Sequence, residues 1–244
     1  MYGDFENMRN LLTLFDYSRS WPLPFIQNGT SLGEWDVYAF DIKDGLDIND
    51  FSCEYLLEEI GIDHVEGIIA APPCTDFSSS GAQYWGQKDA NGKTDRAIDL
   101  VYQVLCAVDL YSPEFWVIEN PVGRLSKLIP ELGKPAYFDP CDYAGYLHPD
   151  NKTLSGLEKI RAKNGHGVTK EEVDFIIEQN AYTKKTGLWG DFKIPETKRI
   201  EPVKCCPQGS FTQRLGGSSE KTKEARSWTP EGFSLAFYEA NKCS

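Results

Sequence analysis

The stretch that decides the fold is "GIIAAPPCTDFSSSG", residues 67–81. It begins as a short apolar run and stops at Pro72 and Pro73, which lack the backbone N–H that a central strand donates. Cys74 follows directly, in front of Thr, Asp, Phe and three serines. The pattern predicts a buried strand that delivers a thiol to a polar loop at its carboxyl end.

Three further apolar runs turn polar in the same way. They are "LLTLFDYS" (residues 11–18), "WDVYAFDIKDG" (35–45) and "EFWVIENP" (114–121), and each predicts a strand. Helices are predicted for "FSCEYLLEEIG" (51–61), closed by its glycine, and for residues 94–112. In the second helix, apolar residues recur at i, i+3, i+4 and i+7 behind Thr94, which we expect to be the N-cap.

Strands that alternate with helices at this spacing indicate parallel pairing, because parallel neighbours need a crossover connection. We therefore predict an α/β fold with a doubly wound, open sheet. Ligands of such sheets bind outside the carboxyl ends of the strands. Asp16, Asp41, Cys74 and Glu119 all fall at or just past predicted strand ends, so we expect them along one edge.

Beyond residue 145 the pattern changes, and we expect smaller parts attached to a catalytic and cofactor-binding domain of residues 1–148. Thr169 and Glu172 fit a capping box within a helical insertion. The predicted parts are the helical insertion (149–181), the last core strand with a small basic recognition segment (182–228), and a C-terminal helix that packs on the catalytic domain (229–244).

The composition indicates a globular chain, with 244 residues, 41% apolar residues and a net charge of −12. The acidic start lacks the features of a signal peptide, and no apolar run approaches membrane-spanning length. We therefore expect a cytoplasmic protein that does not associate with a membrane. Seven cysteines without a CxxC pair and three histidines predict neither a metal site nor a disulfide framework. Residues 182–228 include ten basic and five acidic residues, which fits a basic binding face or a solvated lysine-rich loop.

Residue type alone leaves three interpretations of Cys74. It could be a half-buried structural thiol, a hydrolase nucleophile, or a nucleophile that attacks an electrophilic ring carbon with an acid nearby. A hydrolase would need a histidine base, and the three histidines fall in predicted loops or in the insertion.

The third interpretation agrees with a resemblance. "APPCTDFSSSG" followed by "FWVIENPVGRL" resembles the Pro-Cys loop and the Glu-Asn strand end of the DNA cytosine-5 methyltransferases. "LLTLFDYSRSWPLPFIQNG" and "FDIKDGLDI" resemble their cofactor-binding elements, and "RSWTPEGF" their Arg-x-x-Thr-Pro element. The resemblance spans residues 10–145 and 182–241 and is nearest to short, phage-type members. It implies a Rossmann-like methyltransferase fold with a small C-terminal recognition lobe.

The resemblance also implies the chemistry and the partners. Cys74 would add to carbon 6 of a flipped cytosine in DNA, Glu119 would meet the ring, and S-adenosyl-L-methionine would supply the methyl group. We expect a monomer or weak dimer. The expected cofactor-binding residues are Phe15, Asp16, Tyr17, Ser18, Trp21, Asp41, Ile42, Asp47, Ile48 and Pro72, with Phe15 and Trp21 open to a second interpretation as core aromatics. The expected substrate-binding residues are Pro73, Ser78, Asn120, Lys184, Lys185, Arg214 and Arg226.

Three features depart from the family pattern. "FDYSRSWP" stands in place of a glycine-rich loop, lysines replace the arginines of a Gln-x-Arg-x-Arg strand, and no large recognition domain precedes the last helix. These departures predict short or relaxed sequence specificity. They leave open an enzyme that alkylates a free nucleotide or single strand or uses a modified cofactor, and a non-catalytic relative that binds cofactor or DNA.

Overall fold

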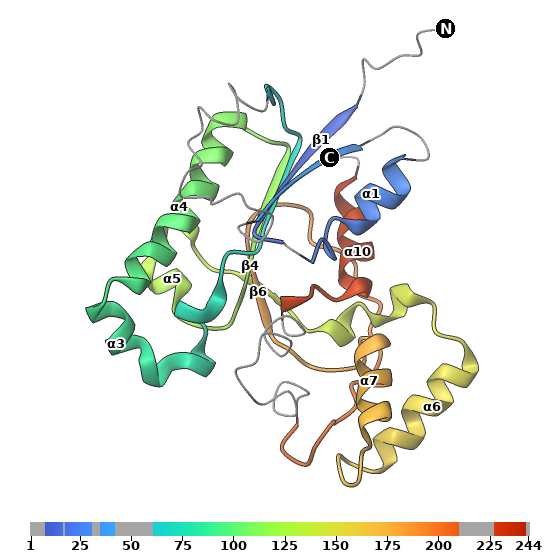
Figure 1. The fold of residues 1–244 in the computed structure, drawn as a ribbon. Helices are drawn as coiled ribbons and strands as arrows, with labels where there is room; N and C mark the ends of the chain where they lie inside the picture. Colours follow the sequence, from blue (N-terminus) through green and yellow to red (C-terminus); the bar gives the residue numbers. More distant parts are fainter. Residues whose placement is uncertain (1–7, 17, 31–34, 42–60, 210–226, 243–244) are drawn as a thin grey trace, which may run out of the picture. The chain divides into compact units, whose positions relative to one another are not determined.

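The computed structural model describes residues 8–16, 18–30, 35–41, 61–209 and 227–242 (Figure 1). The chain divides into two compact units. The first comprises the described parts of Met1–Tyr137, Thr186–Lys193 and Asn241–Ser244, and the second those of Phe138–Lys185 and Ile194–Ala240. The predicted helix at 51–61 lies outside the described residues except for its closing glycine.

A six-stranded sheet forms the centre of the first unit, in the order β2-β1-β3-β4-β6-β5. The first four strands in this order pair in parallel, as predicted, whereas β6 runs antiparallel to β4. The predicted α/β fold with an open sheet is therefore confirmed, and β6 adds an antiparallel strand beyond the parallel part. The strands are β1 (Arg9–Leu14), β2 (Trp35–Phe40), β3 (Gly67–Ala70), β4 (Phe115–Pro121), β5 (Ala136–Phe138) and β6 (Thr186–Asp191).

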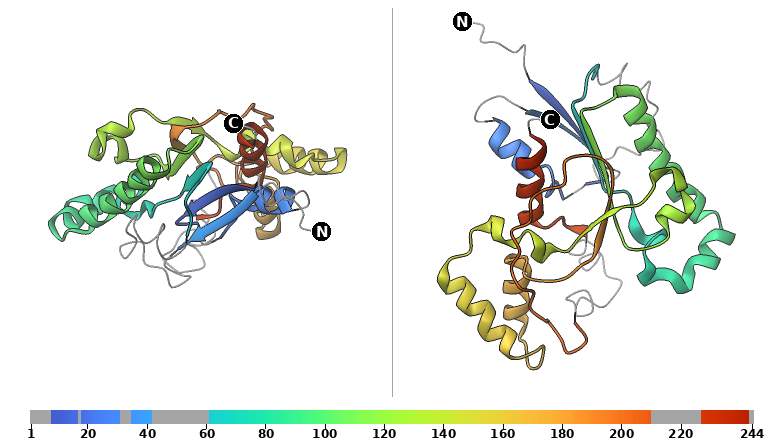
Figure 2. Two further views of the ribbon diagram at one scale, coloured as in Figure 1. Left: turned by 90° about the horizontal axis from the view of Figure 1, so that it is seen from above. Right: turned by 180° about the vertical axis from the view of Figure 1, so that it is seen from behind.

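Helices cover both faces of this sheet (Figure 2). On one face, Val101 and Val104 of α4 (Lys93–Tyr111) pack in a cluster with alternate residues of the strands, such as Leu12 and Ile68. On the other face, Phe25 of α1 (Leu23–Thr30) meets the rings of Trp35 and Phe115. Burial on both faces explains why β3 is apolar throughout rather than alternating.

The start of α4 corrects one sequence prediction. The N-cap is Gly92, in a left-handed conformation with φ 72°, and not Thr94. The hydroxyl of Thr94 instead donates to Asp89 at 2.5 Å and accepts a hydrogen bond from Arg124 at 2.8 Å. The tertiary partner Arg124 thus competes for a side chain that local sequence would use as a cap.

Two short helices flank the carboxyl side of the sheet. They are α3 (Trp85–Ala90) and α5 (Leu125–Leu128), accompanied by 3-10 turns at Cys74–Asp76, Ser79–Tyr84 and Pro130–Leu132. The turn at Cys74–Asp76 continues the loop that follows β3, so it carries the thiol at its first residue.

The second unit is built around helices. Its helices are α6 (Asn151–Ala162), α7 (Lys170–Glu178) and most of α10 (Glu231–Asn241), with 3-10 turns at Pro140–Asp142 and Ala144–Leu147. The capping box predicted for Thr169 and Glu172 is present at the start of α7. Leu157, Ile176 and Tyr182 belong to one buried cluster. In the part of the chain that the structure describes, no helix is long and apolar enough to cross a membrane.

Replacing Gly67 by alanine should destabilise the sheet. A Cβ atom there would lie 2.3 Å from the Phe115 ring, which is 1% exposed and packed against Phe25 and Trp35. We expect a loss of about 1–3 kcal/mol in the free energy of unfolding, as for an overpacked core, measured by urea denaturation. Gly86→Ala is the matched control, because a Cβ atom there meets nothing within 4 Å and alanine favours the helix. Equal stabilities of the two variants would contradict the packing described.

Candidate active site

The thiol of Cys74 is held in a short ordered turn at the carboxyl edge of the sheet. The Cys74 carbonyl accepts hydrogen bonds from the N–H groups of Phe77 at 3.1 Å and Ser78 at 2.9 Å. Phe77 is fully buried and anchors the turn in the core, whereas Cys74 itself is partly exposed. Cys141, Cys205 and Cys206 are buried, so Cys74 differs from them in having an accessible surface.

Glu119 lies on the neighbouring strand at the same edge. Ala70 of β3 pairs with Ile118 of β4, and the side chain of Asn120 donates from Nδ2 to the carbonyl oxygen of Pro72 at 3.0 Å. Asn120 is fully buried, so this bond is shielded from water. Glu119 is partly exposed and directly precedes the residue that fastens the thiol loop. The structure therefore brings the predicted acid and the predicted nucleophile onto adjacent strand ends.

A second pair of carboxyl groups follows β1 and β2. The N–H of Phe15 donates to the Phe40 carbonyl at 2.9 Å, which continues the parallel pairing past β1. Asp16 comes next and is 7% exposed, while Asp41 directly follows β2 and is partly exposed. Burial raises the pKa of Asp16, and the nearby charge of Asp41 adds to this rise.

The Asp16 side chain organises the loop that the sequence predicted for the cofactor. Its Oδ1 accepts from the Ser18 hydroxyl at 2.6 Å and its Oδ2 from the Trp21 N–H at 3.2 Å. Phe15 and Arg19 adopt left-handed conformations, with φ 64° and 51°, which glycine enters far more easily. The chain thus makes a tight turn without a glycine-rich loop, because hydrogen bonds to one carboxylate compensate for the unfavourable backbone angles.

The remaining predicted cofactor-binding residues differ in their burial, and some of them lie outside the described residues. Trp21 is fully buried, so its ring is part of the core. Phe15 is partly buried and packs against the cluster that contains Leu12 and Ile68. Pro72 is buried beside Asn120. Tyr17, Ile42, Asp47 and Ile48 lie outside the described residues.

The predicted substrate-binding residues fall in both units. Pro73 is exposed next to the thiol, and Ser78 is partly exposed and caps the turn that follows it. Lys184 and Lys185 directly precede β6, whose first residue Thr186 pairs with Pro121. Arg214 and Arg226 lie outside the described residues.

Sequence reasoning missed two cationic side chains beside the thiol turn. The Arg124 guanidinium is buried and donates to the Asp76 carbonyl, and Lys88 donates to the Thr75 carbonyl. Their partners are 48 and 13 positions away in the sequence, so local patterns do not predict these contacts. A lone arginine shortly after a predicted strand end was the available signal.

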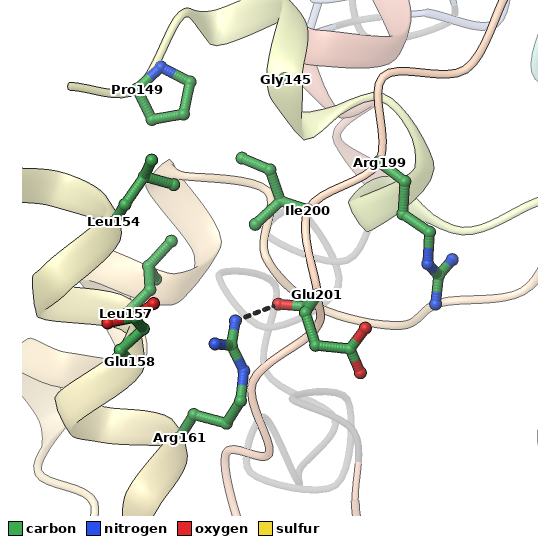
Figure 3. A pocket seen from close by; sticks show the side chains of 9 residues that line it. All are labelled: Gly145, Pro149, Leu154, Leu157, Glu158, Arg161, Arg199, Ile200 and Glu201. Atoms are coloured by element: carbon green, nitrogen blue, oxygen red, sulfur yellow. Dashed lines mark hydrogen bonds between the residues drawn. The ribbon is translucent and has the colours of Figure 1, made fainter. Parts of the chain in front are cut away.

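A pocket of about 370 Å³ lies in the second unit, apart from all these residues in sequence (Figure 3). Leu154 and Leu157 of α6 form its apolar wall, and Arg161 donates to the Glu201 carbonyl beside it. Its lining includes none of the predicted catalytic, cofactor-binding or substrate-binding residues. Among the described residues, no group of His, Cys, Asp and Glu side chains could hold a metal ion.

The comparisons agree with the motifs. Residues 32–128 match the family described as C-5 cytosine-specific DNA methylase. This range contains Asp41, Cys74 and Glu119, but it begins after the loop around Asp16. No curated protein matches the chain. A crystal structure described as a "putative DNA modification methyltransferase encoded within prophage" in E. coli is 17% identical with a TM-score of 0.44, covering 87% of this chain and 56% of its own length.

The thiol loop and the Glu-Asn strand end both lie within the matched range. The match over residues 32–128 agrees with the resemblance to the C-5 cytosine-specific DNA methylase family stated from the motifs. Members of this family use S-adenosyl-L-methionine as the methyl donor. The likeness to the prophage structure is too low to add to this assignment.

The buried carboxyl group of Asp16 predicts a pH-dependent stability. Because its folded-state pKa is raised, the folded protein binds this proton more tightly than the unfolded chain, so stability falls as pH rises from about 4 through the folded-state pKa. Asp16→Asn removes the charge and keeps an acceptor for the Trp21 N–H. The variant should therefore gain stability relative to wild type between pH 4 and 7 in urea denaturation. Asp63→Asn, at an exposed site, is the control for charge removal, and a constant difference between Asp16→Asn and wild type would contradict the prediction.

Proposed function

We propose that this protein methylates carbon 5 of cytosine in DNA through a covalent adduct of Cys74 at carbon 6. The observation that supports this most directly is the hydrogen bond from Asn120 to the Pro72 carbonyl. It fastens the thiol loop to the end of the strand that carries Glu119. The Cys74 sulfur and the Glu119 carboxyl group could therefore contact the same cytosine ring. The match of residues 32–128 to the C-5 cytosine-specific DNA methylase family supports the same reaction.

Each residue type has a defined part in this reaction. Carbon 5 of cytosine is a poor nucleophile until the Cys74 thiolate adds to carbon 6, which breaks the 5,6 double bond and moves its electrons toward carbon 5. Glu119 stabilises the charge that builds at ring nitrogen 3. Carbon 5 would then take the methyl group as its bond to the donor sulfur breaks, which would leave S-adenosyl-L-homocysteine. Loss of its hydrogen as a proton restores the double bond and releases the thiolate.

The cofactor site fits a cationic ligand that carries a ribose. Asp16 and Asp41 place two carboxyl groups at neighbouring strand ends, where ligands of open α/β sheets bind. S-adenosyl-L-methionine supplies an electrophilic methyl group on a positively charged sulfur. Asp41 would accept hydrogen bonds from the ribose hydroxyls, and the Asp16 loop would surround the methionine part. A buried carboxylate next to a second one favours a positive charge between them.

The distribution of charge supports a nucleic-acid substrate despite the acidic composition. The sequence ranges of the second unit hold 14 basic and 14 acidic residues, so the net charge of −12 falls on the first unit. The second unit therefore carries no net negative charge to repel phosphates.

The target cytosine would be flipped out of the duplex to reach Cys74. A DNA substrate also implies the cytoplasm, of a bacterial host if the protein is phage encoded, and we propose a monomer or weak dimer.

Trapping on an oligonucleotide that contains 5-fluorocytosine tests the covalent step. Fluorine at carbon 5 blocks release of the enzyme, so wild type with S-adenosyl-L-methionine should form an adduct visible by denaturing electrophoresis. Cys74→Ala should form none, and Glu119→Gln should slow its formation by about 10²- to 10⁴-fold, as for loss of a proton-handling group. Cys106→Ala is the matched control, because Cys106 is an exposed thiol on α4. An adduct formed equally by Cys74→Ala would overturn the proposal.

Sequence specificity should be short or relaxed. Readout of a duplex needs side chains that reach base edges, and the described residues of the second unit form small helices, short turns and connecting segments. Methylation mapping of a plasmid exposed to the enzyme measures this directly. A strict site of six base pairs would contradict the expectation.

A further inference from the structure

We propose that Arg124 is a positioning residue that fixes the Cys74 turn against the strand carrying Glu119. The proposal rests on the function proposed above and adds a residue to its machinery. The Arg124 side chain bonds to Asp76, Asp89 and Thr94. It acts through the backbone of the turn, the short helix α3 and the start of α4.

The guanidinium of Arg124 joins three segments of the first unit. Its Nε donates to the carbonyl of Asp76, two residues after Cys74, at 3.1 Å. Its Nη1 and Nη2 form a bidentate pair with the Asp89 carboxylate at 2.9 and 2.8 Å. Nη2 also donates to the Thr94 hydroxyl at 2.8 Å. The planar fork can make all these bonds at once, which a lysine cannot.

Burial makes this arrangement specific. Arg124 is 8% exposed, and its guanidinium lies 4.7 Å from the centre of the Trp85 ring on α3. A buried cation that loses one of its partners is costly, because its desolvation is no longer compensated. Movement of the turn, α3 or α4 away from Arg124 would therefore leave the buried guanidinium without one of its hydrogen bonds.

The backbone of Arg124 is bound to the same turn. Its N–H donates to the Phe77 carbonyl at 3.0 Å, and Gly123 forms an antiparallel bridge with Ser78. The Ser79 N–H and hydroxyl both donate to the Val122 carbonyl, at 3.0 and 2.8 Å. The two segments run so close that a Cβ atom on Gly123 would lie 1.9 Å from the Phe77 oxygen.

This second attachment completes a closed frame around the thiol. Asn120 holds Pro72 ahead of Cys74, and Arg124 holds Asp76 and Phe77 behind it. Both holding residues lie within five positions of Glu119 on one stretch of chain. A shift of the turn relative to the acid must therefore break bonds on at least one side. Lys88 adds support from α3, since it donates to the Thr75 carbonyl and lies 3.2 Å from Asp76 Oδ1.

Loss of Arg124 should slow addition of the thiol much more than it weakens cofactor binding. A misplacement of about 1 Å of a reacting group can cost on the order of 10²-fold in rate. The expected cofactor residues Asp16 and Asp41 follow β1 and β2, whereas Arg124 and its partners belong to the segments that follow β3 and β4. A general loss of folding would affect both properties.

The test compares Arg124→Gln, Arg124→Lys and the control Arg96→Gln. Arg96 is an exposed arginine on α4, outside the frame. Thiol addition is followed without methyl transfer, as exchange of the hydrogen on carbon 5 of cytosine in an oligonucleotide with solvent. Cofactor binding is followed separately by isothermal titration with S-adenosyl-L-methionine. Arg124→Gln should lower the exchange rate by about 10- to 100-fold with a dissociation constant within about twofold of wild type. The exchange rate of Arg124→Lys should lie between the rates of wild type and Arg124→Gln.

Two results would overturn the proposal. One is exchange by Arg124→Gln at the rate of Arg96→Gln. The other is a parallel loss of exchange and cofactor binding, which would make Arg124 a residue of general stability. If Arg124→Gln does not fold, Asp89→Asn replaces it, because this change keeps the side-chain shape and removes the charge that Arg124 pairs with. It should then show the same pattern to a smaller extent, and wild-type exchange from Asp89→Asn would likewise reject the role. Absence of exchange and of 5-fluorocytosine adduct in wild type would instead reject the proposed function.

Discussion

The parallel pairing of β3 with β4, prolonged by one side-chain hydrogen bond, is the constraint on which the site depends. Backbone pairing ends near Ala70 because Pro72 and Pro73 offer no N–H donors. The Asn120 amide then supplies a donor to the Pro72 carbonyl from inside the core. A loop that leaves a sheet is normally free to move, and this bond keeps it beside the neighbouring strand.

The cofactor edge shows a different solution to a tight turn. A glycine-rich loop reaches left-handed conformations without cost, whereas Phe15 and Arg19 adopt them with side chains. Hydrogen bonds from Ser18 and Trp21 to a single carboxylate hold the loop together. The carboxylate is buried to do so, which raises its pKa. Loop shape and local charge are therefore set by the same residue.

Local patterns predicted the secondary structure well where the chain follows one strong periodicity. The strands that end before Asp16, Asp41 and the Pro-Cys loop were predicted correctly, and so was the capping box at Thr169. Thr94 was assigned wrongly as an N-cap, because a buried arginine from another segment takes its hydroxyl. The antiparallel direction of β6 was not predicted either, since the direction of a strand depends on the path of the chain that leads into it.

The chemical groups at the strand ends, and their order along the chain, could be predicted from the sequence. Period-2 and period-3.6 patterns reflect burial, and a thiol after two prolines and an acid before an asparagine can be read one residue at a time. How these groups are held depends on contacts between segments that are distant in the sequence. The Asn120–Pro72 bond, the Asp16 loop and the Arg124 frame join residues through side-chain geometry. Partners 48 positions apart, such as Arg124 and Asp76, leave no periodic trace, because their meeting depends on how the whole sheet is assembled.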